Sequence, residues 1–195
     1  MTTRRFSQAI SEGDGISVIV PVGDSESARA AEDQRAEGLI VWDSLPSLRD
    51  VVSLPVLWRG EGSLEEARRC GADAALLIVE RLGDSDDLER LQAQSEALGL
   101  EVVVDVKDAE ELELALERID PEIFLLSPRA AEDGQAAHER VLELLTDVPA
   151  GKLAIADLAG VVRAEVDELE RAGVDAVVVA AGNVTELVGA APPEV

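Results

Sequence analysis

The sequence predicts an α/β protein that folds as a compact (β/α)8 barrel, with eight parallel strands and short loops. Short apolar runs alternate with helical patterns along the whole chain of 195 residues, and such alternation indicates a parallel sheet. Most of the runs are continuously apolar, as in strands that are covered on both faces. Eight strand–helix pairs fit one closed barrel near the small end of its class, whose typical members have about 250 residues.

Eight apolar runs carry the expected strands. They are GISVIVPV (15–22), LIVW (39–42), PVLW (55–58), ADAALLIV (72–79), EVVVDV (101–106), EIFLLS (122–127), KLAIADL (152–158) and DAVVVAA (175–181). A helical pattern follows each run. These patterns are SESARAAEDQRAEG (25–38), SLPSLRDVV (44–52), SLEEARRCG (63–71), DSDDLERLQAQSEALG (84–99), DAEELELALERID (108–120), GQAAHERVLELLTDV (134–148), VRAEVDELERAG (162–173) and NVTELVGA (183–190).

Capping residues mark the ends of the central helices. Ser63 is expected to cap one N-terminus, with Glu66 three residues on as in a capping box, and Gly71 ends that helix. Asp84 or Ser85 opens the next helix.

No linker, charge block or low-complexity segment divides the chain, so residues 1–195 are expected to form a single TIM-barrel domain. Within it, 1–14 is an N-terminal arm and 191–195 a frayed tail. Phe6 and Ile10 are expected to pack either on the bottom of the barrel or on another subunit. The rival architecture is an open doubly wound sheet. It would need a Gly-rich nucleotide-binding turn, and no G-x-G-x-x-G follows the first strand.

Charge and composition limit the partners. The chain carries 41 acidic and 17 basic residues, a net charge of −24, which argues against nucleic acid or an anionic membrane surface. No apolar run approaches the roughly 20 residues that span a bilayer, and the first residues lack the apolar core of a signal peptide. We therefore expect a soluble cytoplasmic protein. Cys70 is assigned to packing or partial exposure and His138 to the surface, and neither a cofactor nor a metal site is expected.

Polar side chains gather where the expected strands end, which is the reactive face of such a barrel. Carboxylates and lysines there can serve in acid–base catalysis, whereas an arginine stays protonated. The catalytic candidates are Arg59, Asp105, Arg129 and Asp157, and the ligand-binding candidates are Trp58, Lys107, Ser127, Gly182 and Asn183.

Two interpretations of these groups stay open. Asp105 near Arg59 or Arg129 can form an ion pair that plugs the barrel mouth, or the same charges can bind a polar substrate. Gly182 and Asn183 open the last helix and can receive an anion, such as a small phosphorylated molecule. The oligomeric state stays open as well.

Four segments carry a family resemblance: LPVL (54–57), GADAALLIV (71–79), LGLEVVVDV (98–106) and AGVDAVVVA (172–180). They resemble the indole-3-glycerol phosphate synthase family, the barrel enzymes of tryptophan synthesis. The resemblance implies a TIM barrel. It also implies, for an active member, a lyase that closes the indole ring with decarboxylation and dehydration.

The resemblance also implies where the family's catalytic groups fall. The family's first strand reads roughly V-I-A-E-I-K, so its glutamate falls on Pro21 and its catalytic lysine on Gly23. The lysine of its K-D-F motif, a general acid, falls on Arg59. The glutamate of its fifth strand falls on Asp105, which is one methylene shorter.

The later motifs are also altered. SPR at 127–129 stands where the family has N-N-R or N-S-R, so only Arg129 is retained. DLAG at 157–160 replaces the phosphate-binding E-S-G-I and lacks its serine.

Since neither lysine position holds a lysine, we expect a diverged, catalytically inactive barrel with a binding or interaction role. Two alternatives stay open. One is a carbon–carbon lyase of this family with a rewired site built from Arg59, Asp105, Arg129 and Asp157. The other is a minimal barrel scaffold without a small-molecule function.

Overall fold

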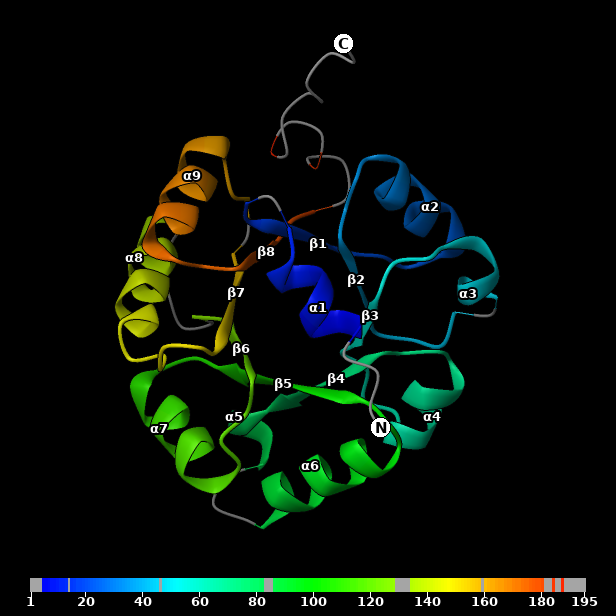
Figure 1. Cartoon of the computed structure of the whole chain (residues 1–195), viewed down its shortest axis with the longest axis horizontal. Coiled ribbons are helices and arrows are strands. Elements are labelled where there is room, and N and C mark those ends of the chain that lie inside the picture. The colour runs from blue at the N-terminus through cyan, green and yellow to red at the C-terminus, as the bar shows by residue number, and fades with distance from the viewer. Residues whose placement is uncertain are drawn as a thin grey trace.

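The computed structural model describes residues 5–13, 15–45, 47–82, 86–128, 134–158 and 160–180, with positions 184 and 187. In this part of the chain, eight parallel strands hydrogen-bond in chain order, and β8 pairs with β1 to close a barrel (Figure 1). Helices surround the strands on the outside. The expected (β/α)8 TIM barrel is therefore confirmed.

The strands are short, with three to six residues each. They are β1 (Ser17–Pro21), β2 (Gly38–Val41), β3 (Val56–Trp58), β4 (Ala74–Ile78), β5 (Glu101–Val106), β6 (Ile123–Leu126), β7 (Leu153–Asp157) and β8 (Ala176–Val178). The helices are α1 (Arg5–Ser11), α2 (Ser25–Asp33), α3 (Leu48–Val51), α4 (Leu64–Arg69), α5 (Val79–Leu82), α6 (Asp87–Ala97), α7 (Ala109–Arg118), α8 (Gly134–Leu145) and α9 (Arg163–Ala172).

Two apolar layers hold the barrel together, because alternate strand residues face opposite sides of a sheet. The inner layer fills the barrel. Its buried residues are Phe6, Ile10, Ile19, Ile40, Leu57, Ala74, Val103, Ile123, Leu125, Ile155, Ala176 and Val178. The outer layer packs the strands against the helices and includes Val20, Val104 and Phe124. Burial on both faces explains why the strand runs are continuously apolar.

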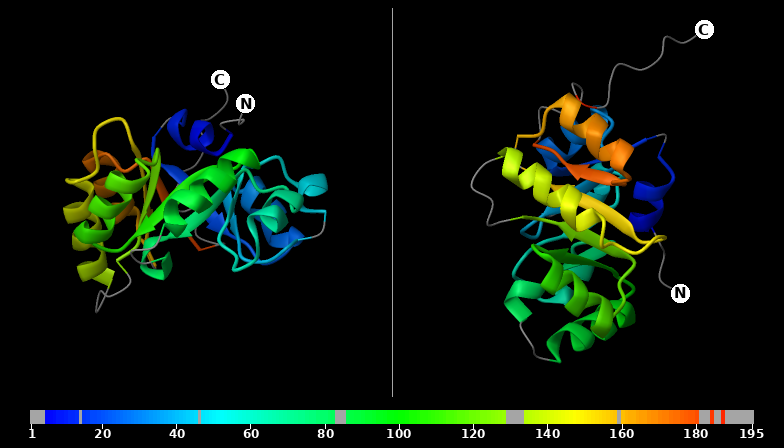
Figure 2. Two further views of the ribbon diagram at one scale, coloured as in Figure 1. Left: turned by 90° about the horizontal axis from the view of Figure 1, so that it is seen from below. Right: turned by 90° about the vertical axis from the view of Figure 1, so that its left-hand side faces the viewer.

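The helix α1 closes the N-terminal end of the barrel, where it lies across the ring of strands (Figures 1 and 2). Phe6 and Ile10 are 0% and 2% exposed and belong to the inner apolar layer. The carboxylate of Glu101, at the start of β5, accepts the backbone N–H groups of Phe6 at 2.6 Å and Ser7 at 3.1 Å. The arm therefore packs on the barrel of its own chain.

Several element boundaries differ from those expected. The fourth strand ends at Ile78, and Val79 begins the one-turn helix α5. The eighth strand ends at Val178, although the N–H of Val179 still bonds to the carbonyl of Ile19. The expected helix starts at Asp84 or Ser85 lie outside the described residues, as do most of NVTELVGA and the tail.

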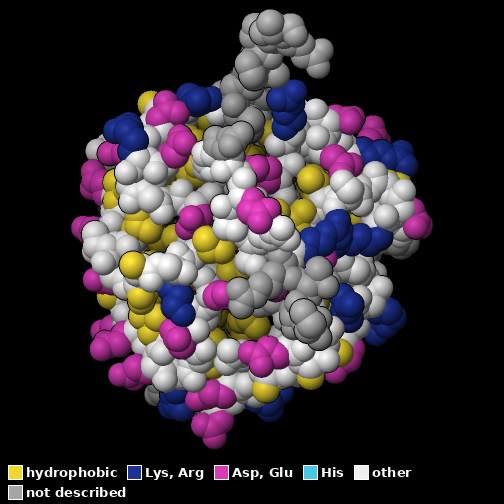
Figure 3. All heavy atoms as spheres, in the orientation of Figure 1, with side chains coloured by type: hydrophobic (Ala, Val, Ile, Leu, Met, Phe, Trp, Pro, Cys, Tyr) yellow, Lys and Arg dark blue, Asp and Glu magenta, His cyan; other side chains and the backbone are white. Residues whose placement is uncertain are grey.

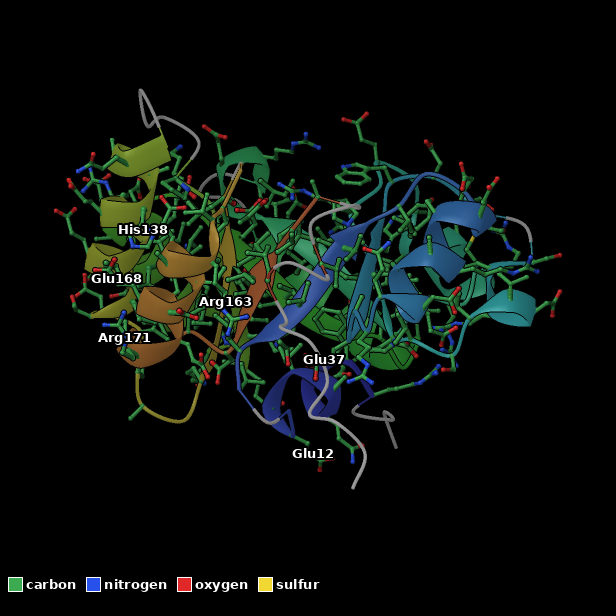
Figure 4. All side chains as sticks on the ribbon, turned by 90° about the horizontal axis from the view of Figure 1, so that it is seen from above. Glu12, Glu37, His138, Arg163, Glu168 and Arg171 are labelled. Carbon is green, nitrogen blue, oxygen red and sulfur yellow. The ribbon has the colours of Figure 1, made fainter. Side chains whose placement is uncertain are left out.

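His138 is buried, so its assignment to the surface is wrong. It is 7% exposed on α8, and its Nε2 lies 3.2 Å from a carboxylate oxygen of Glu168 on α9 (Figure 4). Glu139 and Arg140 beside it suggested a polar stretch. Val141, three residues on, is fully buried, and residues three apart share a helix face.

Charged side chains cover the outside. On the face closed by α1, acidic groups are spread over the middle and the edge, with lysines and arginines among them (Figure 3). Among the described helices, none is both long and apolar enough to cross a membrane.

Candidate functional site

Four polar side chains enter the barrel at its C-terminal end, and the strand period explains why. Leu57, Val103, Leu125 and Ile155 face the interior on β3, β5, β6 and β7. The residue two positions further along faces the same way, within β5 and β7 and one residue past the ends of β3 and β6. These residues are Arg59, Asp105, Ser127 and Asp157, and we call them the mouth cluster.

Arg59 links the two carboxylates of the mouth cluster. Its Nη1 donates to Asp157 at 2.5 Å, and its Nη2 lies 3.8 Å from Asp105. The side chain of Asp105 is fully buried, that of Arg59 is 17% exposed, and that of Asp157 is 22% exposed. The hydroxyl of Ser127 donates a short hydrogen bond to the other oxygen of Asp105. Solvent exposure within the cluster therefore increases from the buried Asp105 to the partly exposed Arg59 and Asp157.

Trp42 follows β2 and lies above the cluster. The guanidinium carbon of Arg59 is 6.0 Å from the centre of its ring, within the range of a cation–π contact. Trp42 is 44% exposed, which is unusual for so large an apolar side chain in this structure. The arginine is thus held from one side by carboxylates and from another by an aromatic face.

The structure brings the predicted pair of Asp105 and Arg59 together, and it adds Asp157 as the nearer partner of Arg59. The sequence contains the signal for this contact, since Arg59 and Asp157 both stand two residues beyond an inward-facing residue. Their meeting depends on how the closed barrel staggers its strands, which the sequence pattern does not specify.

Two other candidates lie away from the mouth cluster. Trp58 is 3% exposed, and its side chain lies in the outer apolar layer between strands and helices. Lys107 follows β5, where its amine contacts carboxylates of Glu80 and Glu111, each at 2.9 Å. The hydrogen bond that this amine donates to Glu80 and, next in size, the one it donates to Glu111 raise the pKa of Lys107 well above its usual value. Its amine therefore stays charged at neutral pH.

Arg129, Gly182 and Asn183 lie outside the described residues, so their assignments stay predictions. Within the described ranges, no group of three or more His, Cys, Asp or Glu side chains is arranged to hold a metal ion.

The mouth cluster combines a buried carboxylate with a fixed cation. A carboxylate such as Asp105 can accept a proton or orient a polar group. The guanidinium can stabilise negative charge, but it cannot donate a proton to a substrate at neutral pH. The arrangement is suited to positioning charge and is poor in proton donors.

Comparison with known proteins points to one family. A family model described as indole-3-glycerol phosphate synthase matches residues 32–184. Curated indole-3-glycerol phosphate synthases from two strains of Acidithiobacillus ferrooxidans are 36% identical to the chain over 140 residues. The matched region covers 69% of this chain and 52% of those proteins. The chain thus spans about half the length of the curated relatives that it matches.

Among solved structures, an N-acetylmannosamine-6-phosphate 2-epimerase from Clostridium perfringens is similar, with a TM-score of 0.69. The match covers 87% of this chain and 88% of the epimerase at 15% sequence identity. An identity this low indicates a shared barrel fold and carries no information about the reaction.

Proposed function

The chain belongs to the indole-3-glycerol phosphate synthase family, and we propose that it is a diverged member whose barrel does not catalyse the synthase reaction. Its role is then to bind a small molecule, or a partner, at the mouth of the barrel without turning it over.

One observation carries this proposal. Arg59 stands where the family's general-acid lysine is expected, and it is bound to Asp157 and Asp105. A guanidinium keeps its protons at neutral pH, so this position has no proton to give to a leaving hydroxyl. General acid–base catalysis contributes about 100- to 10,000-fold to a rate, so the loss is large.

The remaining lysine near this face does not replace the missing acid. Lys107 is paired with Glu80 and Glu111, and its pKa is raised by these hydrogen bonds. Its amine gives up a proton less readily than a free lysine. The arginine at position 59 and the paired state of Lys107 both support the proposal that the barrel mouth lacks a general acid.

A rewired lyase is the second candidate, and Asp105 favours it. This carboxylate is fully buried, accepts a hydrogen bond from Ser127 and lies beside a cation, as a preorganised catalytic group would. In this reading Arg59 and Arg129 stabilise developing negative charge, and Asp105 and Asp157 move protons.

A turnover assay with the family's anthranilate-derived substrate separates the two candidates. We expect no indole product above the uncatalysed rate from the purified chain. Turnover that Asp105→Ala and Arg129→Ala abolish would establish the lyase and contradict our proposal. Arg81→Ala is the matched control, because Arg81 forms an exposed pair with Glu61 and lies outside the mouth cluster.

Thermal shifts then test the binding role. Each compound is added separately: inorganic phosphate, the family's substrate or its indole product. At a ligand concentration about 100 times the Kd, binding stabilises a fold by ~2.7 kcal/mol. We expect stabilisation by a phosphorylated compound. Asp157→Ala should increase it, because the loss of this carboxylate lets the guanidinium of Arg59 pair with the phosphate. A chain that none of them stabilises would be a barrel scaffold without a small-molecule ligand.

A further inference from the structure

A cavity of about 350 Å³ lies outside the barrel, where β3 and β4 end and α4, α5 and α6 pack against them. Leu64, Leu77, Leu82 and Leu91 form much of its wall, and the indole of Trp58 forms one side. The volume is at the lower end of the range of about 300–1,000 Å³ for small-molecule sites. Arg59 reaches its edge, but the other members of the mouth cluster do not line it.

The indole nitrogen of Trp58 is a donor without an acceptor. The residue is 3% exposed, and its Nε1 is buried and hydrogen-bonds to no atom in the described part of the chain. A buried indole N–H normally finds an acceptor, so one without a partner requires an explanation.

Two glycines bring the loop after β3 close to the edge of the ring that carries this nitrogen. A Cβ on Gly60 would lie 2.7 Å from Cε2, the carbon bonded to Nε1, and 2.6 Å from Cζ2. A Cβ on Gly62 would lie 3.2 Å from Cζ2. Both glycines also line the cavity. The segment from Gly60 to Gly62 therefore both lines the cavity and packs on the nitrogen-bearing edge of the ring, and Gly60 also packs on the backbone oxygen of Trp42, which a Cβ would approach to 2.2 Å.

Polar side chains at the edge of the cavity have partners of their own. Glu61 and Arg81 form an ion pair at 3.3 Å, and the neutral amide of Gln94 donates to Glu65, which does not line the cavity. Because the chain as a whole carries a charge of −24, an anion gains little here. The apolar wall with one free donor fits an uncharged ligand.

We propose that this cavity binds a small neutral molecule with an apolar body and one oxygen that accepts a hydrogen bond from Trp58 Nε1, such as an aromatic ketone. Since Nε1 is buried, the bond forms when binding displaces the Gly60–Gly62 segment slightly or turns the indole. The site shares Arg59 with the mouth cluster at its edge, and the proposed ligand contacts neither of the cluster's carboxylates.

The test follows the two indole N–H resonances of the 15N-labelled chain by NMR, because Trp42 and Trp58 are its only tryptophans. Trp42→Phe assigns them. The probe is acetophenone, and ethylbenzene is the matched ligand of similar shape without an acceptor. We expect acetophenone to move the Trp58 resonance downfield in a saturable way and to leave that of Trp42 in place. Ethylbenzene should bind about fivefold more weakly, the change in Kd that one hydrogen bond produces.

Two variants locate the site. Leu91→Phe puts a larger side chain into the cavity and so leaves less space for the ligand. It should weaken acetophenone binding at least about tenfold, because well-packed sites tolerate extra atoms poorly. Leu142→Phe on α8 is its control, a partly buried leucine away from the cavity, and should leave binding unchanged. Trp58→Phe keeps an aromatic ring without the donor. It should remove the preference for acetophenone over ethylbenzene, measured on the ligand signals.

Melting temperatures check that each variant is folded. If Leu91→Phe does not fold, the result for Trp58→Phe decides whether the proposal holds. Equal shifts of both indole resonances, no saturable shift of Trp58, or a preference for acetophenone that persists in Trp58→Phe would each overturn the proposal.

Discussion

At the scale of single residues, Arg59 decides the character of the barrel mouth. It neutralises a fully buried carboxylate, Asp105, and removing one partner of a buried pair leaves an uncompensated charge. We expect Arg59→Ala to lower the free energy of unfolding by about 3–5 kcal/mol in urea denaturation. Arg81→Ala is the control, since its pair with Glu61 is exposed and should contribute at most about 1 kcal/mol. Equal losses in the two variants would show that the mouth cluster is open to solvent.

Asp175 makes the free energy of unfolding depend on pH. Burial raises the pKa of this carboxyl above 3.8, although its Oδ2 accepts the N–H of Ala154 at 2.8 Å. The folded state therefore holds the proton more tightly than the unfolded state. The stability that this group contributes is largest below pH 3.8 and falls as the pH rises through the raised pKa.

Asp175→Asn keeps an oxygen that can accept this hydrogen bond and removes the titration. Relative to the natural chain, the variant should gain stability as the pH rises from 3.8, measured by denaturation at several pH values. Asp24→Asn is a control of opposite sign, because hydrogen bonds from Ser27 lower the pKa of Asp24. Relative to the natural chain, that variant should lose stability as the pH rises toward 3.8, because the contribution of a lowered pKa develops below the unfolded value. If the two variants respond alike, Asp175 is not the source of the effect.

At the scale of elements, the same short motif begins two strands. GADA at 71–74 and GVDA at 173–176 each place a glycine with φ of +85° or +100° at a helix end, a conformation that favours glycine. Asp73 and Asp175 then accept the N–H of a residue on the preceding strand, Val56 or Ala154, each at 2.8 Å. In both places, a carboxylate just before a strand accepts a hydrogen bond from the neighbouring strand, which fixes the register of that pair of strands.

The helix α1 is the element whose loss would open the barrel from below. Phe6 is fully buried, so Phe6→Ala should lower the free energy of unfolding by about 3–5 kcal/mol through lost contacts and a cavity. Gln8→Ala on the exposed side of the same helix should change it by less than about 0.5 kcal/mol. Both values come from urea denaturation followed by circular dichroism. Similar values for the two variants would mean that α1 does not close the barrel in solution.

At the scale of the whole molecule, the net charge of −24 makes the fold repel itself. The Debye length falls from about 30 Å at 10 mM salt to about 8 Å at 150 mM, so added salt screens this repulsion. We expect the melting temperature to rise by about 2–4 °C if screening contributes ~1 kcal/mol. Choline chloride should act like sodium chloride. A rise with sodium alone would indicate a specific cation site instead of screening.

The sequence alone determined the architecture and the end of the barrel at which polar groups gather. Strand runs, capping residues such as Ser63, whose hydroxyl accepts the N–H of Glu66, and the alternation of elements are local properties, and each is set by neighbours along the chain. Eight such units leave few topologies other than a closed barrel. The candidates Arg59, Asp105, Ser127 and Asp157 followed from strand ends alone.

The tertiary structure decided which of these groups meet. Arg59 contacts Asp157 across 98 residues, and Glu101 receives the N–H of Phe6 across 95. Tertiary packing also buries His138 and turns Trp58 toward the helices. Such facts depend on the stagger of the closed strands and on which helix faces touch. A one-residue change of strand register would send Arg59 to the other side of the sheet while leaving every local pattern unchanged.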